Sequence, residues 1–200
     1  MRGVEQIPLL YDAMMAVVEA AGLRRWRLWL VTGARGRTLD LGCGTGRNLP
    51  HLPAGVRAIG LDPAADALQR ARRRAPGVPL VRASAEALPF RDGAFDTVLS
   101  GLAMCSIPRP PLALAEIRRV LAPGAVLRML EHVRSTSPRG ARWQDFIQPL
   151  WTRLAGGCRP NRDTEAAVRA AGFVIDEHGR RERDNMRRFQ ATVSPAAPTE

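Results

Sequence analysis

The chain has no lysine, and this absence changes how its charge is interpreted. All 30 basic residues are arginine, against 19 acidic residues, and the formal net charge is +11. Clustered basic residues would indicate nucleic acid as a partner, but these arginines are scattered and accompany abundant alanine, glycine and proline, as in proteins of GC-rich genomes. Aromatic residues make up only 5%, too few for a base-stacking surface. We therefore expect no nucleic-acid partner; RNA binding, the alternative, predicts an affinity that falls steeply with salt.

Cysteines and long hydrophobic runs are scarce as well. Cys43, Cys105 and Cys158 are odd in number, far apart and free of CxxC or Cys/His ligand spacing. Neither a disulfide framework nor a metal site is predicted, and Cys43 and Cys105 are expected to be packed side chains. Asp12, Glu19 and several arginines break the N-terminal apolar stretches, so we expect no leader or spanning segment. A cytoplasmic protein, at most peripheral at a membrane, fits these absences best.

What the chain does contain is an alternation of short apolar runs and helical patterns, typical of a parallel sheet with helices on its faces. With 200 residues, of which 46% are hydrophobic, it can bury one core, so a single α/β domain is expected. The predicted strands are Thr38–Leu41, Arg57–Asp62, Pro79–Ser84, Phe95–Ser100, Ala125–Val133, Phe173–Asp176 and Phe189–Val193. The predicted helices are Ala64–Ala75, Pro111–Leu121 and Asp163–Ala171.

Three glycines interrupt the chain where the first predicted strand ends. Within Gly42–Gly46, the missing Cβ atoms let a ligand approach the backbone. A dinucleotide site would require a further glycine at position 47, where Arg47 stands. Asp62, at the end of the second predicted strand, can accept hydrogen bonds from both hydroxyls of a ribose. The pattern therefore predicts a ligand that contains a ribose without a pyrophosphate.

Two segments lie outside the alternation, Ile7–Leu30 and Arg134–Arg162, and they hold all four tryptophans. The tryptophans either fix peripheral helices on the body, or the segments form an apolar lid over the cleft at the carboxyl ends of the strands. We divide the single domain into an N-terminal helical cap segment (1–35), a cofactor-binding half (36–133), a lid-like insertion (134–162), a C-terminal helix with strands (163–194) and a tail (195–200).

These residues resemble a known family. The stretch LDLGCGTG, Leu39–Gly46, is similar to the first motif of class I S-adenosylmethionine-dependent methyltransferases, in the methyltransferase type 11 group. Four further segments follow in the family's order: IGLDPAADALQRAR, ASAEALPF, FDTVLSGLAMCSIP and ALAEIRRVLAPGAVL. The resemblance covers roughly residues 36–176. It implies a Rossmann-like, doubly wound, mostly parallel seven-stranded sheet with helices on both faces, and S-adenosylmethionine as the cofactor, with S-adenosylhomocysteine as its product.

The resemblance also implies roles for individual residues. Asp40 and the glycine turn would hold the methionine part of the cofactor, and Asp62 its ribose. Ala85 and Glu86 would contact the adenine, although Ser84 stands where the family often has an aspartate. The end of the fourth strand would lie near the sulfonium. The full predicted cofactor-binding set is Asp40, Gly42, Cys43, Gly44, Thr45, Gly46, Asn48, Asp62, Ala85, Glu86, Ser100 and Gly101.

The acceptor is indicated less specifically. The tetrad N/D-P-P-Y/F, found in family members that methylate exocyclic or amide nitrogens, is missing from the region after the fourth predicted strand, where Ala103–Ser106 stands. A weaker resemblance, through LEHVRS and NRDTEAAVRAAGF with the tryptophans between them, is to a membrane-associated subgroup that includes small-thiol methyltransferases and bacterial phospholipid N-methyltransferases. It implies a small, apolar or lipid-like acceptor, attacked at nitrogen, sulfur or oxygen. A peripheral membrane contact through Leu23–Leu30 is a further expectation.

His132 is the candidate catalytic residue. It ends the fifth predicted strand at the cleft rim, where an imidazole can take a proton from an amine, phenol or thiol. A histidine bonded only to backbone is the alternative. Methyl transfer from a sulfonium depends mainly on alignment and exclusion of water, so a base is optional. The alternative functions are a phospholipid amine N-methyltransferase and a noncatalytic S-adenosylmethionine-binding module whose arginine-rich faces hold a partner.

Overall fold

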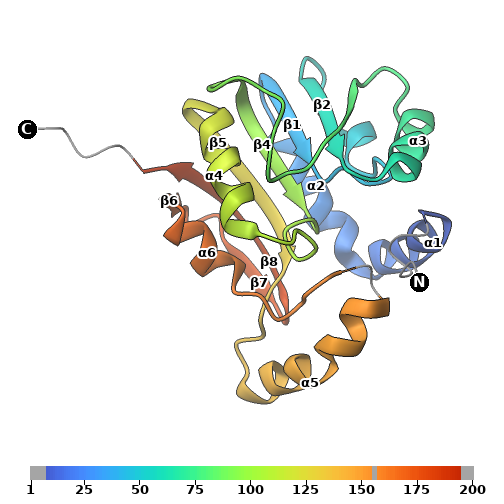
Figure 1. Ribbon diagram of the computed structural model, residues 1–200, viewed down its shortest axis with the longest axis vertical. Helices are drawn as coiled ribbons and strands as arrows, with labels where there is room; N and C mark the ends of the chain where they lie inside the picture. The colour runs from blue at the N-terminus through green and yellow to red at the C-terminus, as the bar shows by residue number, and fades with distance from the viewer. Residues whose placement is uncertain (1–7, 155–156, 195–200) are drawn as a thin grey trace, which may run out of the picture.

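The computed structural model describes residues 8–154 and 157–194, and shows an α/β chain built around one sheet (Figure 1). The strands are β1 (Arg37–Leu41), β2 (Arg57–Asp62), β3 (Leu80–Arg82), β4 (Phe95–Gly101), β5 (Leu121–His132), β6 (Phe173–Ile175), β7 (Arg181–Arg183) and β8 (Met186–Val193). The helices are α1 (Pro8–Val18), the π-helical turn η2 (Glu19–Leu23), α2 (Arg24–Thr32), the 3-10 turn η3 (Leu49–His51), α3 (Ala65–Arg74), α4 (Pro110–Val120), α5 (Pro138–Leu154) and α6 (Thr164–Ala170). Every predicted strand and helix is found, with its ends shifted by a few residues.

The sheet has the predicted, mostly parallel topology. Its order is β3-β2-β1-β4-β5-β8-β6, and β7 pairs with β8 beside this path. Strands β1 to β5 are parallel, while β8 runs antiparallel between β5 and β6. The prediction of seven strands therefore needs one addition. The sequence gives no sign of β7, because Arg181–Arg183 is charged and exposed throughout and lacks an apolar alternation.

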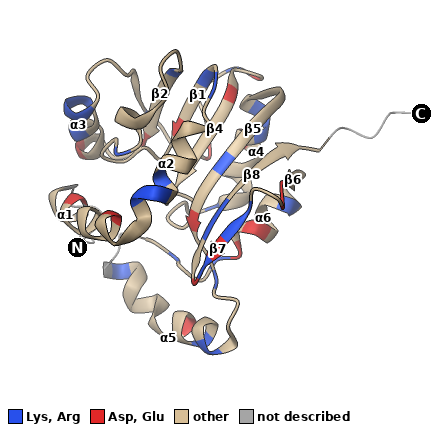
Figure 2. Ribbon diagram, turned by 180° about the vertical axis from the view of Figure 1, so that it is seen from behind, with Lys and Arg blue, Asp and Glu red and all other residues tan. Residues whose placement is uncertain are grey.

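Helices cover both faces of the sheet, as expected for buried parallel strands. Successive residues of β4 point to opposite faces: Val98 lies in the core cluster that contains Ile117 of α4, and Leu99 lies in the cluster that contains Leu30 of α2. Figures 1 and 2 show α4 and α6 on one face and α2 on the other. Figure 2 also shows the basic residues distributed over several elements. The expectation that the chain has no nucleic-acid partner is untested and stays a prediction.

The N-terminal cap is a kinked helical segment whose second helix, α2, packs against the sheet. Gly22, with φ of 122°, bends the chain between α1 and α2. Leu30 is fully buried, and the Arg128 guanidinium lies 4.2 Å from the ring centroid of Trp29. The apolar side chains of Leu23–Leu30 thus pack on the protein, which disfavours the membrane contact expected through this segment. Among the described helices, none is long and apolar enough to span a bilayer.

The insertion after β5 consists mainly of α5, which lies beyond one end of the sheet beside the N-terminal cap (Figure 1). Its two limbs meet where the Arg134 N–H donates to the Arg162 carbonyl at 2.8 Å. The buried Gln144 amide donates to the carbonyls of Val133 at 3.1 Å and Pro160 at 3.2 Å. The insertion therefore leaves and rejoins the body at one place. Ile7 and the tail (195–200) lie outside the described residues.

Candidate functional site

The glycine turn follows β1 and leaves a stretch of backbone open to a ligand. Gly42, Gly44 and Gly46 have φ of 65°, 53° and 77°, values that glycine adopts without strain. A Cβ at Gly46 would lie 2.9 Å from Ala71 of α3, whereas a Cβ at Gly44 would meet no described atom within 4 Å. Gly46 is therefore needed for packing α3 on the turn, and Gly44 leaves space beside the backbone.

Asp62, at the end of β2, shapes this turn. Its two carboxylate oxygens accept hydrogen bonds from the N–H groups of Gly44 and Ala64, each at 2.9 Å. Burial raises the pKa of Asp62, although both hydrogen bonds favour the ionised form. Each oxygen keeps a second acceptor position, so the predicted ribose contact is compatible with the turn. Cys43 is buried in the turn, and a Cβ at Gly60 of β2 would lie 3.0 Å from its sulfur, as expected of a packed side chain.

Asp40 lies fully buried in β1, beside the turn. Its Oδ1 accepts a hydrogen bond from Asn48 at 2.8 Å, while its Oδ2 has no partner among the described residues. Arg27 of α2 donates to the Asn48 Oδ1 at 2.5 Å and to Glu19 at 2.6 Å. Burial raises the pKa of Asp40 to about 7. A cationic amino group bound above the turn would stabilise the ionised form of this carboxylate.

Acidic residues of the N-terminal cap close over the glycine turn. Asp12 of α1 accepts hydrogen bonds from the Thr45 hydroxyl at 2.7 Å and from Arg74 at 2.9 Å. Arg47, which replaces the glycine of a dinucleotide motif, pairs with Glu19 at 2.6 Å. Sequence reasoning missed these contacts, because it used the two acids only as evidence against a spanning helix. The thirty or so residues before β1 are thus tied directly to the ligand-binding turn.

A buried glutamate organises the loop after β4. Glu131 of β5 accepts hydrogen bonds from the Ser100 hydroxyl at 2.6 Å and from the Met104 N–H at 3.2 Å. Burial raises the pKa of Glu131 to about 7. In the same loop Leu102 has φ of 60°, which is unusual for leucine, and a Cβ at Gly101 would lie 3.0 Å from a leucine of α2. Sequence reasoning missed Glu131, although an acid within the apolar run RMLEHV was a signal.

The predicted adenine contacts lie at the loop after β3. Ala85 is buried in the core. The Glu86 carboxylate accepts hydrogen bonds from the Arg109 backbone N–H at 2.7 Å and from its Nε at 2.8 Å, and these bonds lower the pKa of Glu86. The Ser84 hydroxyl accepts from the Glu86 N–H at 3.2 Å. Because Arg109 already engages the carboxylate, the contact between Glu86 and adenine stays a prediction.

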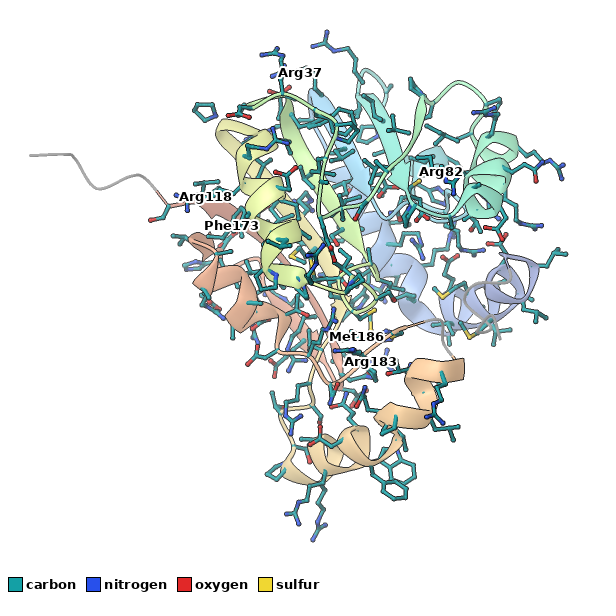
Figure 3. The ribbon with its side chains drawn as sticks, in the orientation of Figure 1. Arg37, Arg82, Arg118, Phe173, Arg183 and Met186 are labelled. Atoms are coloured by element: carbon teal, nitrogen blue, oxygen red, sulfur yellow. The ribbon has the colours of Figure 1, made fainter. Side chains whose placement is uncertain are left out.

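A cavity of about 540 Å³ opens beside the loop after β4, between the N-terminal cap and α5. Both segments that were predicted to form a lid contribute to its wall. The wall includes Trp26, Leu102, His132, Trp143, Trp151 and Met186. Figure 3 shows Arg183 and Met186 between the sheet and α5. His132 thus faces a largely aromatic and aliphatic space, where its predicted role as a base is sterically feasible.

The fold assembles three residues that are distant in the sequence. The ligand atoms of Cys105, His132 and Cys158 all lie within 4.8 Å of one another. The Arg159 N–H donates to the Cys105 carbonyl at 2.9 Å, which fastens the end of the insertion to the loop after β4. Hydrogen bonds from Cys105 and His132 lower the pKa of Cys158. Nothing in the sequence indicated this cluster, because it forms in space and leaves no spacing motif; the prediction of no metal site is untested.

Comparison with known proteins identifies the family. The methyltransferase domain family matches residues 39–129. The chain belongs to the class I S-adenosylmethionine-dependent methyltransferases. The chain resembles thiol S-methyltransferase TMT1B of Homo sapiens, at 34% identity over 155 residues that cover 72% of this chain and 63% of that protein. Demethylmenaquinone methyltransferase of Renibacterium salmoninarum is 36% identical over 132 residues, covering 63% of this chain and 55% of that protein.

A solved structure shows the same fold. The S-adenosylmethionine-dependent methyltransferase of Mesorhizobium loti superposes with a TM-score of 0.60 at 20% identity, covering 80% of this methyltransferase and 91% of that chain. The chain spans less than two thirds of each relative compared by sequence: 63% of the thiol S-methyltransferase and 55% of the demethylmenaquinone methyltransferase.

The residues present fit S-adenosylmethionine, the cofactor of this family. The open space beside Gly44 admits a ligand to the turn, and the unpartnered, buried Asp40 oxygen supplies negative charge below it. Asp62 stands at the end of β2 with acceptor positions left for a ribose. Asp40 and the turn would hold the methionine part, and Asp62 the ribose. When bound, S-adenosylmethionine supplies an electrophilic methyl group on a sulfonium sulfur.

Proposed function

We propose that the chain is an enzyme that transfers a methyl group from S-adenosylmethionine to a small, apolar acceptor. The cavity beside the loop after β4 carries the proposal, because the cap and α5 border it and its wall is largely apolar. The chain's own contribution is to align the acceptor with the donor and to exclude water. His132, in the cavity wall, is the residue we propose to receive the acceptor's proton.

The relatives and the cavity both support a small or apolar acceptor. One relative is named for a thiol and the other for demethylmenaquinone, and a cavity of about 540 Å³ suits a small molecule or one end of a larger one. A phospholipid amine is the second candidate. It is favoured by the exposed apolar side chains that α5 presents beside the cavity, such as Phe146, which is 78% exposed.

Replacement of Asp62 tests the cofactor site. Asp62→Ala should weaken binding of S-adenosylmethionine and S-adenosylhomocysteine about 10- to 100-fold, because two hydrogen bonds from the ribose to a carboxylate are lost. Asp62→Asn, which keeps an acceptor for the Gly44 N–H, should weaken it less. Asp92→Asn, whose side chain is 82% exposed, serves as the control and should bind as wild type does. Isothermal titration measures all four proteins; equal affinity in Asp62→Ala and wild type would refute the site.

Turnover separates the enzyme from a noncatalytic binding module. The wild-type protein is incubated with S-adenosylmethionine labelled at the methyl group and with separate pools of small thiols, phenols and phospholipid amines. Label in the thiol or phenol pool supports the proposal, and label in the phospholipid pool alone supports the second candidate. Cofactor binding without label in any pool contradicts the proposed enzyme and favours the binding module.

A further inference from the structure

Cys105, His132 and Cys158 form a set of possible metal donors, of which His132 lines the acceptor cavity. They come from the loop after β4, the end of β5 and the end of the insertion, and their ligand atoms lie within 4.8 Å of one another. In a tetrahedral zinc site, bonds of about 2.3 Å to sulfur and 2.0 Å to nitrogen place neighbouring ligand atoms roughly 3.5–3.8 Å apart. A small inward movement of the three side chains is therefore enough to bind a zinc ion.

The burial of the set is compatible with a zinc ion held by two thiolates. Cys105 and Cys158 are 2% and 1% exposed, and one zinc ion with two thiolates and a neutral imidazole carries no net charge. A neutral group of this kind is buried at a lower cost in free energy than two isolated thiolates. Two sulfur donors and one nitrogen donor in a compact arrangement also match the borderline-soft zinc ion better than magnesium or calcium, which prefer oxygen.

Within the described part of the chain, the set lacks the fourth ligand that a tetrahedral zinc ion requires. Among the described residues, the cluster contains three possible ligands and no fourth Cys, His, Asp or Glu. Structural zinc sites have four protein ligands, whereas catalytic ones have three and leave a position for water or substrate. His132 belongs to the cavity wall, as does Trp151, which lies close enough to hydrogen-bond Cys158. A ligand that completes the site would therefore enter from the acceptor cavity.

We infer that Cys105, His132 and Cys158 bind a zinc ion whose fourth position takes the sulfur of an acceptor thiol. The inference rests on the proposed methyl transfer and names its acceptor class. A thiol bound to zinc is deprotonated: the S–H bond breaks, the proton passes to solvent, and the electron pair stays on sulfur. That pair forms the new S–C bond, and the electron pair of the breaking bond stays on the donor's sulfur. With zinc bound, His132 is a metal ligand, and the zinc ion takes the place of His132 as the group that promotes loss of the acceptor's proton.

Metal content tests the site without reference to activity. After equilibration with zinc and exhaustive dialysis under reducing conditions, wild-type protein should retain about one zinc ion per chain, measured by elemental analysis. Cys158→Ser and Cys105→Ser should lose it, while Cys43→Ser, a buried cysteine outside the set, should keep it. Cobalt loaded in place of zinc should show sulfur-to-metal charge-transfer absorption that disappears in Cys158→Ser. Equal zinc content in all four proteins, or none in wild type, would overturn the inference.

Methyl transfer then tests the acceptor class. Removal of zinc with a chelator, or Cys158→Ser, should lower the methylation of small thiols at least about tenfold, and added zinc should restore the chelated wild-type protein alone. Titration with S-adenosylhomocysteine in each preparation shows whether the fold and the cofactor site are intact. If wild type binds the cofactor but thiol methylation does not depend on zinc, the inference fails while the proposed function stands. If wild type neither binds the cofactor nor transfers methyl, the proposed function itself fails.

A disulfide between the same cysteines would also overturn the inference. It would appear as the loss of two reactive thiols in protein purified without reductant, together with a failure to take up zinc after reduction. Reduced protein that takes up zinc and then resists thiol-specific alkylation at Cys105 and Cys158 supports the metal site, because metal-bound thiolates are protected. Peptide mapping by mass spectrometry identifies which cysteines are modified.

Discussion

Two acidic side chains illustrate how the candidate site depends on burial at the level of single residues. Asp40 and Glu131 are fully buried, in β1 and β5. Burial raises the pKa of each to about 7, so near neutral pH each is partly protonated. Glu131 sets the loop beside the acceptor cavity through Ser100 and Met104, whereas Asp40 supports the glycine turn through Asn48. The glycine turn and the loop beside the acceptor cavity are therefore each supported by a fully buried carboxyl group.

Replacing Glu131 by Gln should flatten the dependence of stability on pH. Burial raises the pKa of Glu131 from 4.5 to about 7, so the folded chain keeps a proton that the unfolded chain releases. The contribution of Glu131 to the free energy of unfolding should thus be greatest below about pH 4.5, fall as pH rises to about 7, and level off above that, at about 1.4 kcal/mol per unit of pKa difference. Glu131→Gln should lose this contribution, while Asp40 and Asp62, whose pKa values burial also raises, should still contribute in the same direction.

The measurement is denaturant unfolding between pH 4.5 and pH 8, the range set by these pKa values. Glu177→Gln, at a surface side chain that is 60% exposed, should keep the wild-type profile. The same slope in wild type and in Glu131→Gln would show that burial of Glu131 does not control the pH dependence.

At the level of elements, the N-terminal cap is tied to the cofactor turn by ion pairs and packs on the sheet through α2. Burial by itself would raise the pKa of Asp12, but hydrogen bonds from Arg74 and Thr45 and the charge of Arg74 outweigh it and lower the pKa. The carboxylate is therefore ionised at neutral pH. The Asp12 side chain is only 11% exposed, so solvent screens these interactions weakly.

Asp12→Asn should loosen the cap. We expect a loss of about 1–3 kcal/mol from the contacts between α1 and the glycine turn, because charge-assisted hydrogen bonds become neutral ones. Limited proteolysis within residues 8–32 should become faster, and the affinity for S-adenosylmethionine should fall, while α2 stays packed through Leu30. Asp92→Asn is the matched control, since that carboxylate is exposed. Unchanged proteolysis and affinity in Asp12→Asn would mean that the ion pairs do not hold the cap.

At the scale of the whole molecule, exposed apolar side chains gather on the cap and the insertion. In α1, Leu9 and Val17 are 66% and 70% exposed, and in α5, Trp143, Phe146 and Leu150 are 62%, 78% and 64% exposed. Both helices border the acceptor cavity. We propose that this surface, and not Leu23–Leu30, makes the expected peripheral contact with a membrane interface, where aromatic and apolar side chains partition favourably.

Sedimentation with lipid vesicles checks this contact. Wild-type protein should bind vesicles that contain anionic lipids, and Phe146→Ser should weaken the binding about tenfold or more, because one buried aromatic side chain contributes about 1.5–3 kcal/mol. Leu112→Ser, in α4 and 42% exposed, removes an apolar side chain elsewhere and should have little effect. If both variants bind vesicles as well as wild type does, α5 is not the membrane contact.

The sheet and the glycine turn could be predicted from the sequence, because each is marked by residues that are close together in the chain. Apolar runs mark β1 to β5, and the glycines with Asp62 mark the place where a ligand approaches backbone. It was insufficient wherever a contact joins distant segments. Asp12 and Arg74, or Cys105 and Cys158, are brought together only by the packing of the cap and the insertion. Strand β7 was missed for another reason: its three charged, exposed residues lack the apolar alternation that marks a strand.

The two ends of the insertion lie together, and this affects how a protein with this fold can change during evolution. Because Arg134 and Arg162 meet through a backbone hydrogen bond at 2.8 Å, the segment between them can lengthen, shorten or be exchanged without shifting β5 or the glycine turn. Loops whose ends lie together tolerate such changes at a small cost in closure entropy. The donor half of the protein can therefore remain constant in a lineage while descendants acquire new acceptors by replacing one segment.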